Sequence, residues 1–176
     1  IVLREGKWDI PGYLGNGRSL GMNLAYLMMD LPYGVPYTID HAYPFLKDKF
    51  IGFGFPDIIF QPQDAFHRLL SRQRETDAAL VLGLFSIDRF HRGEAVSLGS
   101  DGEIETVGTR ANSSSAHTWI IAVWSPTFFR FLHEYVSKHH RRLITGMIEE
   151  GPHGLAELPL GEVFQGAIDA GIRVDS

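Results

Sequence analysis

Asp57 follows a short apolar segment, at a position where a carboxylate could bind a metal ion. Residues 50–55 form a continuous apolar run with two glycines, the pattern of a buried central strand. The predicted strand closes on Pro56 and the carboxylate of Asp57. In open α/β sheets ligands gather at the carboxyl ends of strands, and Mg²⁺ usually takes one or two carboxylates beside phosphate oxygens. Asp57 is therefore a candidate metal ligand, and an Asp that caps the following turn is an equally good interpretation.

A second candidate is the backbone around Gly34 and Pro36, which separates a predicted strand from a predicted helix. A glycine there would let a flat ligand approach the main chain, although an ordinary turn glycine explains the position more simply. The sequence lacks the motifs that indicate several other kinds of catalytic or binding site. The chain has no Cys, no HExxH pair and no nucleophile elbow, and its glycines at 12, 15, 17 and 21 do not lie between a strand and a helix. We interpret His133, His139 and His140 as solvated helix residues.

The elements that must position these residues alternate between strands and helices. Strands are predicted at residues 21–28, 50–55, 78–85, 118–124 and from 172, with a hairpin at 95–98 and 103–107 around Ser-Asp-Gly. Helices are predicted at residues 38–47, 62–76, from Pro126 onward and at 160–170. Buried strands alternating with helices predict an α/β layered domain with helices on both faces of the sheet.

The composition and net charge of the chain argue against some classes of function. The chain has 176 residues, 44% of them hydrophobic, and a formal net charge of −5. This mild acidity argues against a nucleic-acid partner, and no apolar run reaches the roughly 20 residues that span a bilayer. We expect a single cytoplasmic domain, residues 1–176. Since it begins at Ile1 and stops just after an apolar stretch, we expect it to be incomplete at both ends.

Several stretches together resemble a known family. Residues 8–11 (WDIP) and 13–26 (YLGNGRSLGMNLAY) are similar to the "yLGdGs-x-x-G-x-x-l-x-Y" stretch of sugar-nucleotide pyrophosphorylases, of the glucose-1-phosphate thymidylyltransferase type. The family continues with a P-x-G stretch before a helix and an apolar strand ending in Asp. Here these are residues 32–34 (PYG) and Asp57. Order and spacing agree over nearly the whole chain.

The resemblance implies a three-layer α/β/α, Rossmann-like nucleotidyltransferase domain of the GT-A-like kind with a mostly parallel mixed sheet. It implies a Mg²⁺-dependent enzyme of nucleotide-sugar biosynthesis, in which a sugar-1-phosphate attacks a nucleoside triphosphate and pyrophosphate leaves. By resemblance Asp57 would bind the metal, the Gly34 backbone would contact the nucleobase, and Arg110 would replace a Lys that holds the sugar phosphate. An exposed loop arginine is an equally good interpretation of Arg110. A homo-oligomer is one option for the assembly.

The sequence also departs from the family pattern. The glycine-rich G-x-G-T-R-L-x-P loop that holds the triphosphate is not found, and Gly108 stands where the sugar-phosphate segment has Glu. Met29 replaces a Gln that often reads the base, and a thioether cannot form an amide's pair of hydrogen bonds. We therefore expect this chain by itself not to catalyse the transfer. A catalytically inactive binding or regulatory module with the same fold is the alternative. A GT-A glycosyltransferase is disfavoured because Asp57 is not part of a D-x-D motif.

Overall fold

The structure is a computed structural model that describes residues 1–30, 33–86, 94–108, 117–150 and 157–176, with 142–150 as backbone only. Its strands are β1 (Val2–Arg4), β2 (Leu27–Met29), β3 (Ile51–Gly54), β4 (Leu80–Ser86), β5 (Ala95–Leu98), β6 (Ile104–Gly108), β7 (His117–Trp124) and β8 (Val174–Asp175). Its helices are α1 (Asp9–Leu14), α2 (Val35–Asp40), α3 (Tyr43–Leu46), α4 (Ala65–Thr76), α5 (Pro126–Glu150) and α6 (Leu160–Asp169), with a 3-10 turn η1 at Arg18–Leu20.

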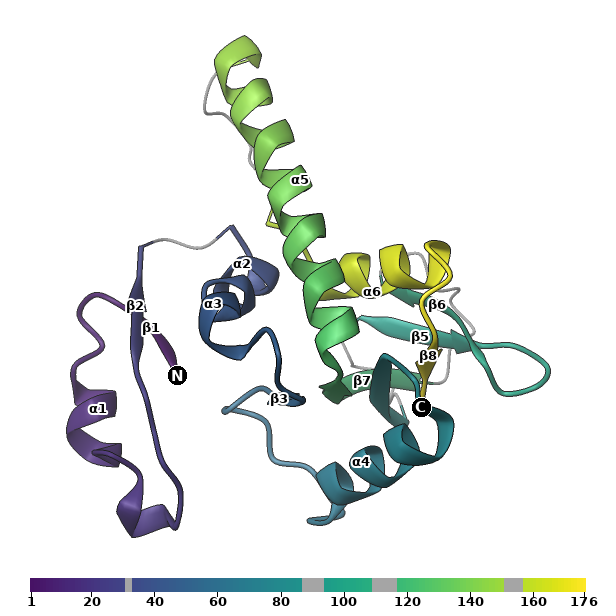
Figure 1. The fold of residues 1–176 in the computed structure, drawn as a ribbon, viewed down its shortest axis with the longest axis horizontal. Coiled ribbons are helices and arrows are strands. Elements are labelled where there is room, and N and C mark those ends of the chain that lie inside the picture. The colour runs from purple at the N-terminus through teal and green to yellow at the C-terminus, as the bar shows by residue number, and fades with distance from the viewer. Residues whose placement is uncertain (31–32, 87–93, 109–116, 151–156) are drawn as a thin grey trace.

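The main sheet is organised around β7. One edge of β7 pairs along its length with β4, and the other edge is shared by β3 near the end of β7 and by β5 near its start. Strand β6 lies outside β5, and β8 lies outside β4 (Figure 1). Strand β7 is antiparallel to β3, β4 and β5, whereas β8 runs parallel to β4. The sheet is mixed, as expected, but among the described residues its pairings are chiefly antiparallel rather than parallel.

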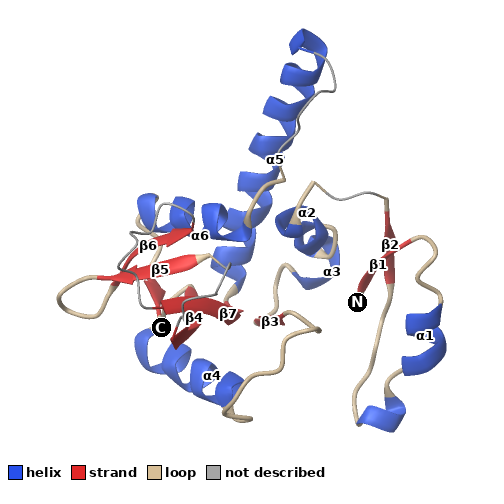
Figure 2. Ribbon diagram, turned by 180° about the vertical axis from the view of Figure 1, so that it is seen from behind, coloured by secondary structure: helices blue, strands red, loops and turns tan. Residues whose placement is uncertain are grey.

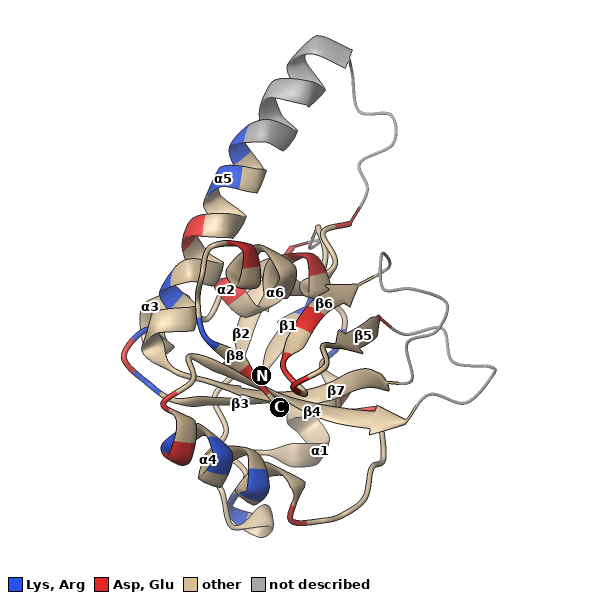
Figure 3. Ribbon diagram, turned by 90° about the vertical axis from the view of Figure 1, so that its right-hand side faces the viewer, with Lys and Arg blue, Asp and Glu red and all other residues tan. Residues whose placement is uncertain are grey.

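Helices cover both faces of this sheet, which confirms the predicted α/β class with three layers (Figure 2). Along β4, Leu80 and Leu82 point into a core shared with α5 and α6, while Val81 points into a second core under α4. This alternation follows from the two-residue period of a strand, and it explains why β4 is apolar at successive positions. Figure 3 shows no charged position on β4 or β7, whereas Lys and Arg lie along α4.

The N-terminal segment forms a separate small unit. Strands β1 and β2 pair in parallel, from Val2 opposite Leu27 to Arg4 opposite Met29, and α1 and η1 lie in the connection between them. In Figure 1 this unit (purple) stands to one side of the main sheet, next to α2 and α3. The strand predicted at residues 21–28 is shorter than expected. It begins only at Leu27, because β1 offers a partner of only three residues.

The helix predicted at residues 38–47 is two helices. Helix α2 begins earlier, at Val35, since Pro36 fits the first turn of a helix, where no backbone N–H is required. Pro44 cannot supply the hydrogen bond that a continuous helix would need, so it stands instead in the first turn of α3. No helix within the described residues is both long and apolar enough to cross a membrane.

Candidate functional site

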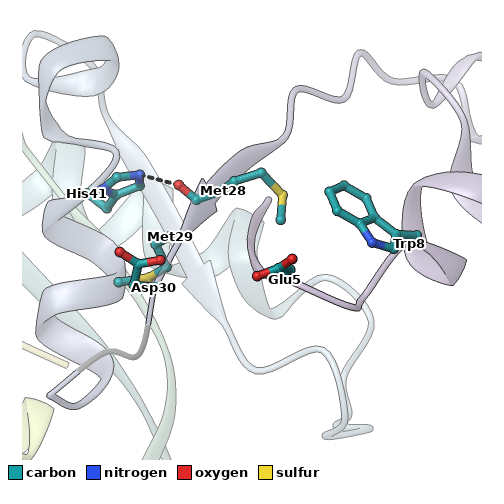
Figure 4. A pocket seen from close by; sticks show the side chains of 6 residues that line it. All are labelled: Glu5, Trp8, Met28, Met29, Asp30 and His41. Carbon is teal, nitrogen blue, oxygen red and sulfur yellow. Dashed lines mark hydrogen bonds between the residues drawn. The ribbon is translucent and has the colours of Figure 1, made fainter.

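A cavity of about 550 Å³, the Met29 pocket, opens between the N-terminal unit and the end of α2. It is lined by Glu5, Trp8, Met28, Met29, Asp30 and His41 (Figure 4). His41 follows the last residue of α2, and its Nε2 lies 2.9 Å from the carbonyl oxygen of Met28 in β2. This hydrogen bond ties the strand that carries Met29 to the helix that begins after Gly34.

A second cavity, the α2–α5 pocket, adjoins the first and shares Met29 and His41 with it. Its volume is about 330 Å³, and its further lining residues are Tyr33, Tyr37, Asp40, Val136, Ser137 and His140. Among the residues that the structure describes, neither set of lining residues contains Lys or Arg. Aromatic and thioether surface beside carboxylates suits a flat ring bearing amino groups better than a phosphate chain, which calls for cations or backbone N–H groups.

Gly34 is the N-cap of α2, between strand and helix as predicted, and the preceding residue Tyr33 lines the α2–α5 pocket. The φ of 113° at Gly34 is in the region that favours glycine. A Cβ built there would lie 2.4 Å from the carbonyl oxygen of Leu158, whose N–H donates a hydrogen bond to the Tyr33 carbonyl. The glycine is thus required by a close approach of two main chains. A contact between its backbone and a nucleobase stays a prediction.

Asp57 lies three residues beyond the end of β3, which stops at Gly54 rather than at the carboxylate. Its side chain is exposed on the turn that follows the strand. The described residues contain no group of three His, Asp or Glu side chains that could hold a metal ion. The part of Asp57 in a metal site stays a prediction.

Arg110, the predicted sugar-phosphate ligand, lies outside the described residues. The nearby Gly108, where the family segment has Glu, lines a third cavity of about 570 Å³ between β6 and α6. Of the three predicted site residues, the structure therefore describes two, with Gly34 at the N-cap of α2 and Asp57 on the turn after β3.

The interpretation of the α5 histidines as solvated residues is wrong for two of them. His133 Nδ1 lies 2.8 Å from Asp40 Oδ1, and its ring stacks on Tyr43 with centroids 4.0 Å apart. His139 Nδ1 lies 2.9 Å from the Tyr37 hydroxyl. Both histidines thus pack against α2 and α3, because α5 crosses these helices. No local pattern predicts these contacts, since Asp40 and His133 are 93 positions apart in the chain.

Two acidic or weakly acidic groups at this interface have raised pKa values. Burial raises the pKa of the Asp40 carboxyl, and its hydrogen bond to His133 opposes that rise. Burial, followed by the charges of Tyr33 and Asp40, raises the pKa of Tyr37, so its hydroxyl stays protonated and can donate to His139. Asp40, Tyr37 and His41 line the pockets, and sequence patterns singled out none of them.

Glu94 is a structural carboxylate in the third cavity. It accepts hydrogen bonds from the Gly161 N–H at 2.9 Å, in the first turn of α6, and from Trp119 Nε1 at 3.0 Å. A carboxylate suits the positive end of a helix dipole. Burial nevertheless raises the pKa of Glu94, although both hydrogen bonds oppose the rise.

The raised pKa of Glu94 makes stability depend on pH. Between the unfolded and folded pKa values the folded state keeps a proton that the unfolded state has released. The free energy of unfolding contributed by Glu94 should therefore fall as pH rises from about 4.3, the ordinary Glu value, through its folded pKa. Urea unfolding of wild type and Glu94→Gln at several pH values checks this. An equal dependence of the free energy of unfolding on pH in the two proteins would contradict the prediction. Asp40→Asn serves as a control, because the pKa of the Asp40 carboxyl is also raised.

Comparisons with known proteins agree with this architecture. No family model and no curated protein sequence matches the chain. A solved structure assigned as a glucose-1-phosphate thymidylyltransferase from Bacillus anthracis, in complex with a sucrose, is similar with a TM-score of 0.72 at 15% identity. The inositol-1-phosphate CTP transferase of T. maritima is similar with a TM-score of 0.67 at 18% identity.

These similarities cover 100% and 99% of this chain but only 66% and 64% of the two solved chains. The chain thus spans slightly under two thirds of their length. At such low identity the similarity concerns the fold, which agrees with the resemblance seen in the sequence. The chain has the mixed α/β, Rossmann-like fold of sugar-nucleotide nucleotidyltransferases.

Proposed function

We propose that this chain serves nucleotidyl transfer from a nucleoside triphosphate to a sugar-1-phosphate, which gives a nucleotide sugar and pyrophosphate. The observation that carries the proposal is a fold similarity that runs along the entire chain, with a TM-score of 0.72. The two joined cavities support it, since Met29, the residue at which the resemblance puts base recognition, lines both of them.

In this proposal the residues have separate roles. The base lies in the Met29 pocket, near the Gly34 backbone. Asp57 holds Mg²⁺, which when bound neutralises phosphate charge and so lowers the barrier to in-line displacement. Arg110 holds the phosphate of the acceptor, where a guanidinium can form two parallel hydrogen bonds. Such a reaction needs positioning and charge neutralisation more than covalent catalysis by the protein.

One observation favours the alternative of a non-catalytic binding module. The described residues that line the two joined pockets include no Lys or Arg, and the sequence holds no G-x-G-T-R-L loop for the triphosphate. Removing several charge-stabilising contacts costs orders of magnitude in rate, because each 1.4 kcal/mol, roughly, is a factor of ten. The 176-residue chain should therefore bind a nucleotide yet release no pyrophosphate.

The test has a binding arm and a turnover arm. Calorimetric titration of the chain with ATP, GTP, CTP, UTP and dTTP, each with Mg²⁺, should find binding of at least one triphosphate. Pyrophosphate release is then measured with a panel of sugar-1-phosphates, for the chain and for the full product of its gene. Turnover by the full product that needs both metal and sugar-1-phosphate supports transfer. Binding without turnover by either protein supports the module, and absence of binding by both contradicts the proposal.

A further inference from the structure

Helix α2 connects Gly34 with the two joined pockets. Its N-cap is Gly34, its residues Tyr37 and Asp40 line the α2–α5 pocket, and His41 after its end bonds to β2. Yet α2 contains only six residues, from Val35 to Asp40. A helix this short has little stability of its own in water, so its position must be set by what it packs against.

The contacts that hold α2 come mainly from α5. His133 Nδ1 and Asp40 Oδ1 lie 2.8 Å apart, with side chains 41% and 19% exposed. The His133 ring stacks on the Tyr43 ring with an interplanar angle of 1°. The Tyr43 ring in turn packs on Phe129 in a T-shaped arrangement, with the ring centroids 5.1 Å apart. Phe129 itself is fully buried in the main core. His133 thus joins the end of α2 to an element whose own position the core fixes.

The hydrogen bond to the Asp40 carboxylate determines which ring nitrogen of His133 carries the hydrogen. A carboxylate only accepts hydrogen bonds, so Nδ1 must carry the hydrogen in this contact. His133 does not line either pocket, whereas Asp40 does. An effect of His133 on a ligand would therefore pass through Asp40 and α2.

We propose that His133 is a positioning residue, which through its hydrogen bond to Asp40 holds α2 in the geometry that nucleotide binding requires. This inference rests on the proposed nucleotide site. Loss of this bond frees the end of α2 that carries His41. The hydrogen bond between His41 and the Met28 carbonyl, which keeps the Met29 pocket in shape, is then weakened as well.

Two substitutions separate the ring from the hydrogen bond. His133→Phe keeps an aromatic ring to stack on Tyr43 but has no N–H to donate. His133→Asn loses the ring but places an amide N–H near the position of Nδ1. We expect His133→Phe to weaken binding of the best of the five Mg²⁺-triphosphates by about tenfold. His133→Asn should recover a large part of that loss.

The fold offers a matched control for general destabilisation. Arg72 Nε and Asp175 Oδ1 lie 2.9 Å apart, with side chains 49% and 16% exposed, and they join α4 to β8 on the other face of the sheet. Asp175→Ala should therefore lower the melting temperature about as much as Asp40→Ala, but only Asp40→Ala should weaken nucleotide binding.

The outcomes are distinct. If His133→Phe binds as tightly as the wild type, or if Asp175→Ala weakens binding as much as Asp40→Ala, the positioning role is wrong. If His133→Asn binds no better than His133→Phe, an N–H returned near the position of Nδ1 does not restore binding, so the hydrogen bond to Asp40 is not what positions α2, which also overturns the proposal. If no triphosphate binds the wild type, the proposed function fails instead. All variants are titrated at a temperature well below their measured melting points.

Discussion

Replacement of Asp57 by Asn should remove the Mg²⁺-dependent part of nucleotide binding, and with it turnover in the full product of the gene. The side chain is exposed on the turn after β3, so its loss leaves the cores untouched and the melting temperature should not change. The amide keeps the shape of the carboxylate but loses the negative charge that a hard cation requires. Since a metal can contribute several kcal/mol to stabilising phosphate charge, we expect turnover to fall by about a hundredfold or more.

Asp64→Asn is the matched control for this variant. Asp64 is another exposed aspartate seven positions further along, and it forms an ion pair with Arg68 in the first turn of α4 at 3.0 Å. Nucleotide titrations with and without Mg²⁺ should distinguish the two variants. A fall in melting temperature for Asp57→Asn with unchanged Mg²⁺ dependence would identify Asp57 as a cap of its turn and would remove it from the site.

Replacement of Gly34 by Ala should cause the largest loss of stability among the substitutions considered. The added Cβ would stand 2.4 Å from the Leu158 carbonyl oxygen and 2.9 Å from the Leu158 nitrogen, and the backbone φ of 113° is itself unfavourable for alanine. Main-chain atoms cannot rotate away as the end of a flexible side chain can, so Gly34 and Leu158 must separate. We expect a loss of about 2–4 kcal/mol in the free energy of unfolding, measured by urea denaturation.

Gly12→Ala serves as the comparison for Gly34→Ala. Gly12 lies inside α1, and a Cβ there would meet no heavy atom within 4 Å. Alanine favours helix over glycine, so this variant should be as stable as the wild type or more stable by up to about 1 kcal/mol. Equal midpoints for the two variants would show that α2 and Leu158 do not approach as described. Loss of nucleotide binding in Gly34→Ala must be judged against its unfolding curve, because displacement of α2 alone would cause it.

The candidate site shows how far residue patterns reach. Patterns found Gly34 between strand and helix and Asp57 after a strand, because turn chemistry and apolar runs are local properties. The prediction that this strand is buried is wrong, since the residues of β3 alternate between half-buried and exposed. The patterns did not find Asp40, His41 or the part that His133 plays. These residues carry no motif, and their contacts join segments that only folding brings together.

By itself the sequence determined the alternation of elements in this chain and hence its α/β class. The apolar run of β4, the Ser-Pro start of α5 and the Ser-Asp-Gly turn between β5 and β6 each specify structure over a few residues, where propensity and period decide. Tertiary structure decided the rest. Strand β7 is antiparallel to three neighbours, and α5 presents His133 to Asp40 from 93 residues away. Partners and directions of this kind depend on which distant surfaces bury one another, a property of the packed core that no local pattern contains.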